Sequence, residues 1–148
     1  MLTNSASDPD VPPQTLAYSL LSAPIGASID MNSGLFTWRP AVMQSPSIQT
    51  VVVFVADNGS PPLSVTQNFF VTVSRPAMPT LFSASVTNDQ FGFSSNGDAG
   101  PDYAIQAYTN LVNWSSMATS NSPVLPYFWA DTNSALFPLR FYRVILGP

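Results

Sequence analysis

The stretch "QTVVVFVADNGSPPLSVTQNFFVTV", residues 49–73, decides the fold class of this chain. Two apolar runs stand out: Val51, Val53 and Val55 share one face of the first, and Val65, Phe69, Val71 and Val73 share one face of the second. The letters "DNGSPP" separate the two runs, and Asp, Asn, Gly and Pro are the residues that form tight turns. This pattern predicts two neighbouring antiparallel β-strands joined by a loop.

Short runs of the same kind recur along the rest of the chain. Leu16, Tyr18 and Leu20 alternate with small or polar residues, as do the apolar residues of 103–107, and "LRFYRVIL" (139–146) has two apolar faces. Fifteen prolines and seven glycines interrupt the chain, and no segment keeps an apolar period of 3.6 residues. The sequence therefore predicts an all-β fold made of small antiparallel β-sandwiches.

A proline-rich stretch divides the chain near its middle. "SRPAMPT" (74–80) follows the second of the two strands above and is typical of a short, stiff linker. We expect one sandwich in residues 1–74, a linker in 75–80 and a second sandwich in 81–148. The first sandwich is expected to lack its leading strand, because residues 2–7 supply only the tail of one.

The composition limits the catalytic chemistry that is available, leaving a carboxylate pair acting as acid and base. The chain has 148 residues, all eight of its acids are Asp, all four of its cations are Arg, and it contains no His, Cys, Lys or Glu. Imidazole bases, thiol or amine nucleophiles and disulfides are thus excluded. We expect no enzyme. With a net charge of −4 and scattered arginines we also expect no nucleic-acid partner.

Composition and hydropathy also indicate where the protein acts. No run approaches 18 consecutive apolar residues, so no direct membrane insertion is expected. Only 8% of the residues are charged, and solubility depends on Ser, Thr, Asn and Gln, as in many secreted β modules. The beginning "MLTNSASDPD" has neither a basic start nor an apolar core. We expect an extracellular or cell-surface protein whose export signal is not present in this chain.

The first half resembles a known family. "SASDPD", "TLAYSL", "IDMNSGLFTW" and "VADNGSPPLS" are similar to the motifs of cadherin-like, immunoglobulin-like (dystroglycan-type) repeats of large secreted or surface proteins, over residues 3–74. In such repeats the Asp-x-Asp loop and the Asp of Ala-x-Asp bind calcium. The resemblance implies that Asp8, Asp10 and Asp57 are calcium ligands.

Two interpretations of Asp57 remain open. Asp before Asn-Gly is commonly a turn former, because its carboxylate accepts hydrogen bonds from nearby backbone amides. Three carboxylates on adjacent loops also suit calcium, which takes six to eight oxygen ligands. The region after "SGLF" and the "SRPAMPT" linker lack the further acids that the family has there, so we expect at most weak calcium binding.

The second half shows a general strand pattern and no specific motif. "DYAIQAYTNLVNW" (102–114), "FWADT" (128–132) and "RFYRVILGP" (140–148) are similar to fibronectin type III-like modules of secreted bacterial proteins. Trp114 is expected in the core, as a lone Trp is in such folds. Asp98, Asp102 and Asp131 lie in expected loops, where two carboxylates could serve as acid and base, but Asp beside Gly and Pro is more commonly a turn former, and we expect turns.

Aromatic side chains provide the main alternative. Tyr127 and Trp129 alternate along "PYFWA", and a pair of exposed rings could form a flat platform for a sugar. The sequence thus predicts a non-catalytic adhesion or scaffolding segment of a larger secreted or surface protein, whose partners are other modules of that protein or surface proteins. The alternative is a carbohydrate-binding accessory module with polysaccharide as its partner.

Overall fold

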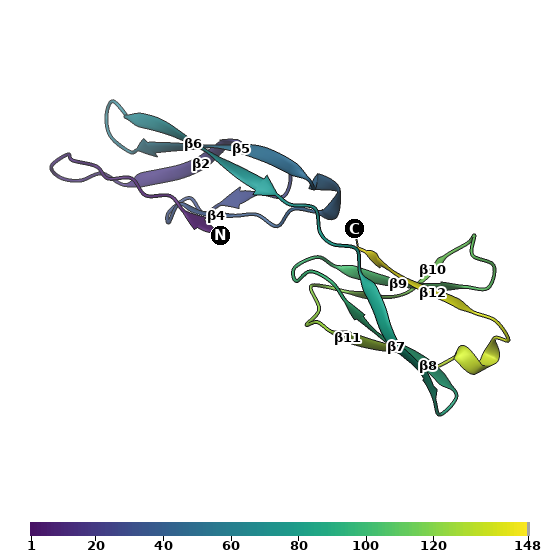
Figure 1. Cartoon of the computed structure of the whole chain (residues 1–148). Helices are drawn as coiled ribbons and strands as arrows, with labels where there is room; N and C mark the ends of the chain where they lie inside the picture. Colours follow the sequence, from purple (N-terminus) through teal and green to yellow (C-terminus); the bar gives the residue numbers. More distant parts are fainter. Residues whose placement is uncertain (148) are drawn as a thin grey trace. The chain divides into compact units, whose positions relative to one another are not determined.

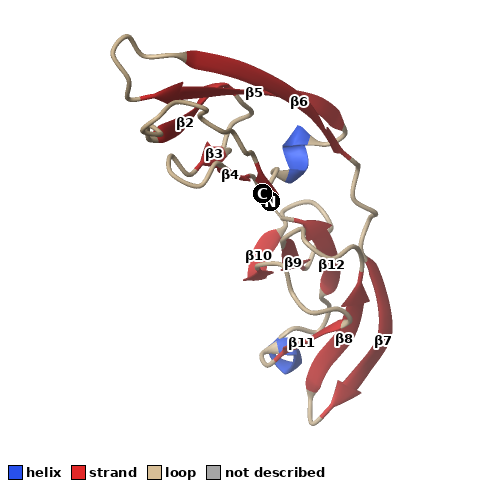
Figure 2. Ribbon diagram, turned by 90° about the vertical axis from the view of Figure 1, so that its left-hand side faces the viewer, coloured by secondary structure: helices blue, strands red, loops and turns tan. Residues whose placement is uncertain are grey.

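The computed structural model describes residues 1–147, and almost all of its regular structure is β-strand. The chain divides into two compact units. The first comprises Met1–Pro40 and Gln44–Ser74, and the second comprises Ala41–Met43 and the chain from Arg75 onward. Both are β-sandwiches of two small antiparallel sheets, so the predicted fold class is confirmed (Figure 2).

The first unit contains two three-stranded sheets. One has the order β1-β4-β3 and the other has the order β2-β5-β6 (Figure 1). The strands are β1 (Leu2–Thr3), β2 (Leu16–Ser22), β3 (Ser28–Ile29), β4 (Leu35–Thr37), β5 (Ser47–Asp57) and β6 (Ser64–Val73), and the one-turn helix η1 spans Val42–Gln44.

The core of this unit comes from the alternating face of its central strand. Val51, Val53 and Val55 of β5 are buried, together with Tyr18 of β2 and Phe36 of β4. Strand β5 lies between β2 and β6, so both its edges are paired, and its inner face is covered by side chains that include Phe36 of β4. Every second residue of this run is thus buried, as expected of a strand with one face against the core.

The first strand of the unit is short and is fixed by a glycine. Strand β1 pairs with β4, and the amide of Asn4 donates to the carbonyl of Gly34 at 3.0 Å. Gly34 has φ +67°, and a Cβ there would collide with the Asn4 carbonyl and the Tyr18 ring. Only glycine fits this turn, because it lacks the Cβ and tolerates positive φ.

The second unit repeats the plan with different pairings. One sheet has the order β11-β8-β7 and the other has the order β10-β9-β12. The strands are β7 (Thr80–Thr87), β8 (Gln90–Asn96), β9 (Tyr103–Tyr108), β10 (Ser115–Ser120), β11 (Tyr127–Asp131) and β12 (Phe141–Leu146), and the one-turn helix η2 spans Ser134–Leu136.

Aromatic rings dominate the core of the second unit. Phe93 of β8, Tyr103 and Ile105 of β9, and Val144 of β12 are buried between the two sheets. The ring of Phe93 lies 5.7 Å from that of Trp129 and 6.2 Å from that of Tyr142. Tilted contacts at this spacing are favourable for aromatic pairs.

Candidate functional site

The predicted calcium ligands lie on two loops at one end of the first unit. Leu16, the first residue of β2, pairs with Asp57, the last residue of β5. The loop before β2 and the loop after β5 therefore emerge at the same end (Figure 1). They are also linked directly, because the amide of Thr15 donates to the Asn58 side-chain carbonyl at 2.9 Å.

Two of the three carboxylates close their own loops. Asp8 accepts the amides of Asp10 at 2.8 Å and Gln14 at 2.7 Å, one on each oxygen. Asp57 accepts the amides of Gly59 at 2.9 Å and Leu63 at 3.0 Å, both on Oδ1. These are the side-chain to backbone bonds expected of turn-forming Asp. The turn interpretation of Asp57 thus has direct structural support.

The three carboxylates fall short of the ligand set that calcium requires, which is six to eight oxygens. Among the described residues, no three His, Cys, Asp or Glu side chains form a group that could hold a metal ion. The three carboxylates therefore do not make a calcium site by themselves. Further oxygens would have to come from elsewhere, and in this loop Gln14 Oε1 is buried without a hydrogen-bond partner. The calcium assignment stays a prediction.

The packing of Gln14 also explains the glycine of the "DNG" turn. A Cβ at Gly59 would overlap with the Gln14 side-chain amide. The glycine thus lets the two loops approach each other closely, which is a common reason for glycine at a tight crossing. In the structure, the Asp57-Asn58-Gly59 turn packs closely against the loop that precedes β2.

Loop closure gives a direct prediction for Asp57. Replacing it with Ala removes the acceptor of two backbone amides, and we expect the free energy of unfolding of the first unit to fall by about 1–3 kcal/mol. Asp57→Asn keeps one acceptor oxygen and is expected to cost less. Hydrogen exchange of the β2, β5 and β6 segments in urea measures both, because tryptophan fluorescence would also report Trp114 and Trp129 of the second unit. Equal stability of wild type and Asp57→Ala would contradict loop closure.

The predicted sugar platform lies on β11, and its two rings face inward. Tyr127 and Trp129 are half-buried and pack against the second core. Phe128, between them, is on the opposite face and is 61% exposed. A stacking platform needs a ring face open to solvent, so the exposed ring of this strand is Phe128 and neither of the two candidates.

Trp114 does not lie in the core, and the expectation that it would be buried there is wrong. Its ring is half-buried and stacks against the guanidinium of Arg143, 4.2 Å from the ring centroid, while its indole N–H donates to the Leu111 carbonyl. The structure builds the second core from Phe93 and its neighbours, so this Trp is not needed to fill it. The cation–π contact covers one of its faces.

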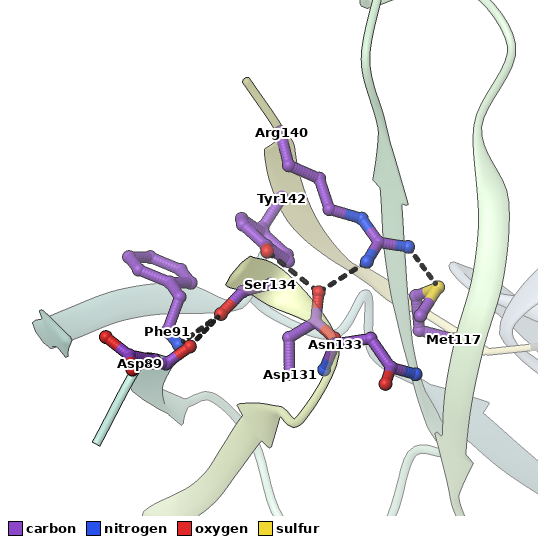
Figure 3. Close-up of polar contacts among 8 residues, drawn as sticks. All are labelled: Asp89, Phe91, Met117, Asp131, Asn133, Ser134, Arg140 and Tyr142. Carbon is purple, nitrogen blue, oxygen red and sulfur yellow. Dashed lines mark hydrogen bonds and ion pairs between the residues drawn. The ribbon is translucent and has the colours of Figure 1, made fainter. Parts of the chain in front are cut away.

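A buried charge cluster in the second unit was not foreseen from the sequence. Asp131, at the end of β11, is 2% exposed and accepts on Oδ2 from Arg140 at 2.6 Å and from the Tyr142 hydroxyl at 2.9 Å (Figure 3). Its Oδ1 accepts the amide of Asn133 at 2.9 Å. Arg140 also donates to the Met117 sulfur. The carboxylate is thus neutralised and hydrogen-bonded, as a buried charge requires.

Asp131 was expected to form a turn, and it does accept the amide two residues on. Its other oxygen joins two sheets, because β11 and β12 belong to different layers of the sandwich. The one signal in the sequence is that Arg140 and Tyr142 alternate at the start of a strand, so both side chains lie on one face. Nothing in the sequence shows which acid they meet.

The cluster changes the acidity of its tyrosine. Burial, helped by the hydrogen bond to Asp131 and its charge, raises the pKa of Tyr142 from 10.0 to about 12. The folded state therefore holds this proton more tightly than the unfolded state does. The resulting stabilisation is complete below pH 10 and is lost as the pH rises toward 12.

This difference predicts an alkaline loss of stability that depends on Tyr142. The chain has no Lys or Cys, so between pH 10 and 12 only tyrosines among its side chains titrate substantially. We expect the urea midpoint of the second unit to fall across this interval, and to fall less steeply in Tyr142→Phe. Burial also raises the pKa of Tyr103, so a residual slope should remain. Identical slopes in the two proteins would contradict the assignment.

Comparison with known proteins gives a plain result. No protein-family model, curated protein or solved structure matches this chain. The architecture is compatible with an immunoglobulin-like fold, since both units are small antiparallel sandwiches. The finer family assignments remain resemblances of sequence. In the part of the chain that the structure describes, no helix has the length and apolar character to cross a membrane.

Proposed function

We propose that this chain is a non-catalytic adhesion or scaffolding segment of a larger secreted or surface protein. One observation carries the proposal: most of the acidic side chains maintain the structure. At least six of the eight Asp side chains accept backbone amides of nearby or facing loops, namely Asp8, Asp30, Asp57, Asp98, Asp102 and Asp131.

Carboxylates used in this way stiffen the loops at the ends of a sandwich. Asp30 is a clear case, since it accepts the amide and hydroxyl of Ser33 and the amide of Asn32, and these bonds lower its pKa. A lowered pKa keeps the group ionised and suits a permanent acceptor. It does not suit a general acid, which must hold a proton near neutral pH. Rigid loops on two tandem sandwiches support a spacer or docking role.

In this proposal, calcium binds only weakly, and to the first unit. Because Asp8 and Asp57 already accept backbone amides, we expect binding to the isolated chain no tighter than on the order of 10⁻⁴–10⁻³ M. Titration calorimetry measures this, with Asp8→Asn/Asp57→Asn as the control that should abolish any signal. Micromolar affinity would contradict this expectation.

The function itself is tested by bead adhesion. Beads that carry the chain are scored for retention on surfaces coated with immobilised extracellular matrix proteins, alongside beads that carry a heat-unfolded sample. Retention by the folded chain only, with no turnover of a panel of hydrolase substrates, supports the proposal. Retardation in polysaccharide gels that is lost in Phe128→Ala would instead favour the carbohydrate-binding alternative, because Phe128 is the exposed ring of β11.

A further inference from the structure

Every three-stranded sheet has two outer strands with a free edge, and most of those edges are protected here. The pairing of β7 is interrupted between Phe82 and Ser85, where Ser83 has φ +51°, and β2 and β10 have similar register shifts. Strand β12 carries Arg143. Strands β1 and β3 have two residues each, and β11 has five. Bulges, charges and short length all discourage pairing with another chain.

Strand β6 lacks all of these protections. It has ten residues, and its register with β5 runs without a shift from Ser47 opposite Val73 to Ala56 opposite Ser64. No residue of Ser64–Val73 is charged, and none is proline. Val65 is 59% exposed and Phe70 is 69% exposed. A long, regular and uncharged edge with exposed apolar side chains is a template for strand addition.

The hydrogen-bond pattern shows which backbone groups of β6 are free. The amide of Asp57 donates to the carbonyl of Leu63 at 3.1 Å, which fixes this pair as a hydrogen-bonded one. Such pairs alternate along an antiparallel ladder, so the odd-numbered residues of β6 bond to β5. The amides and carbonyls of the even-numbered residues, from Ser64 to Thr72, therefore point to the free edge. The Asn68 carbonyl also accepts a long hydrogen bond from the Gln67 side chain, at 3.4 Å, which a second strand would displace.

The sequence of β6 matches itself about Phe69 at the centre and at the outer positions, while Gln67 opposite Val71 and Asn68 opposite Phe70 are mixed pairs. In an antiparallel pair of two β6 strands centred there, Val65 lies opposite Val73, Thr66 opposite Thr72, and Phe69 opposite its own copy. All paired residues then share a face, as the two-residue period of strands requires. Matched β-branched, threonine and aromatic pairs are the cross-strand pairs that stabilise sheets. The even-numbered residues form the hydrogen-bonded pairs in this register, in agreement with their free backbone groups.

We propose that two copies of this chain associate through β6, in an antiparallel pair centred on Phe69. The two β2-β5-β6 sheets then become one continuous six-stranded sheet, related by a two-fold axis. A second copy is favoured over another partner because the strand complements itself in this register and carries no charge that would select a different sequence. This inference is independent of the proposed function.

The test introduces charge at the outer positions of the pair. Thr66 and Thr72 are exposed, and in the centred register each lies opposite the other residue of the second copy. Thr66→Lys/Thr72→Lys places Lys opposite Lys twice. We expect the wild-type chain to sediment as a concentration-dependent dimer between micromolar and submillimolar concentration, and this variant to dimerise about tenfold more weakly or not at all.

A charge-pair variant tests the register. Thr66→Lys/Thr72→Asp places opposite charges against each other twice in the centred pair, so dimerisation is expected to return to at least the wild-type level. Thr80→Lys/Thr87→Lys adds the same charge to β7 and is expected to leave the dimer unchanged. Far-ultraviolet circular dichroism of each variant confirms that the sheets are retained.

Each other outcome overturns the proposal. A wild-type chain that stays monomeric over the whole range would leave the β6 edge to a strand from a different protein. A dimer insensitive to Thr66→Lys/Thr72→Lys would be held by another surface. Failure of Thr66→Lys/Thr72→Asp to restore the dimer, with the sheets retained, would exclude the register centred on Phe69.

Discussion

Replacing Asp131 with Asn is expected to lower the free energy of unfolding of the second unit by about 3–5 kcal/mol, because it removes one partner of a buried ion pair. Asp131 is 2% exposed and Arg140 is 12% exposed, so the guanidinium would be left almost out of water without a counter-charge. A loss of this size should lower the melting temperature of a unit of this length by more than about 10 °C.

The matched control is Asp89→Asn. It makes the same chemical change in the same unit, at an exposed turn between β7 and β8 where φ is +59°. Asn tolerates this conformation about as well as Asp does, so we expect a change within about 0.5 kcal/mol. Hydrogen exchange of the β8, β11 and β12 segments under mild denaturant measures both. Equal effects of the two substitutions would show that the Asp131 pair does not stabilise the unit.

A double substitution separates the unpaired charge from the lost contacts. Asp131→Asn/Arg140→Met removes both charges and keeps most of the apolar length of Arg140, which packs over the Phe137 ring at 4.1 Å. If the penalty comes from the uncompensated guanidinium, the double variant should be more stable than Asp131→Asn alone. A double variant that is less stable would assign the loss to the contacts of Arg140 with Phe137 and Met117.

The two longest strands could be predicted from sequence because their pattern is local. Val51, Val53 and Val55 show the face of β5 that the structure buries, and the run of residues 65–73 gives β6 nearly to the residue. In a strand that is buried on one face, the two-residue period is imposed by the core itself. No knowledge of the partner strands is needed to see it.

Strands that depend on their neighbours gave no such signal. Strand β10 (Ser115–Ser120) reads "SSMATS", which has no apolar alternation, and it is a strand because β9 pairs with it. Strand β4 has only three residues. In both cases pairing with an adjacent strand decides the conformation, and weak local preference does not oppose it.

The candidate sites were limited in the same way. Asp8 and Asp57 could be placed at one end of the first unit because both flank predicted strands, yet the hydrogen bonds that occupy them depend on loop conformation. The Asp131 cluster depends on two strands from different sheets, so no spacing in the sequence reveals it. Such contacts are set by tertiary packing, which a single sequence does not display.

The second large effect is expected at Phe93. Its ring is 1% exposed and lies within 6.2 Å, centroid to centroid, of Phe91, Trp129 and Tyr142. Phe93→Ala removes this ring from the centre of the second core and leaves a cavity that the two sheets cannot fully close. We expect the free energy of unfolding of the second unit to fall by about 3–5 kcal/mol.

Phe128→Ala on the adjacent strand is the control that isolates burial. Phe128 pairs with Ser94, next to the Trp129–Phe93 pair, and points to the opposite face with 61% of its surface exposed. Both substitutions remove the same atoms, so the two variants differ in the burial of the ring and in its place on a central or an edge strand. We expect Phe128→Ala to cost less than about 1 kcal/mol, measured by the same hydrogen exchange of β8 and β11. If Phe128→Ala proved the more damaging of the two, the inner and outer faces of this sheet would be reversed, and with them the burial of Tyr127 and Trp129.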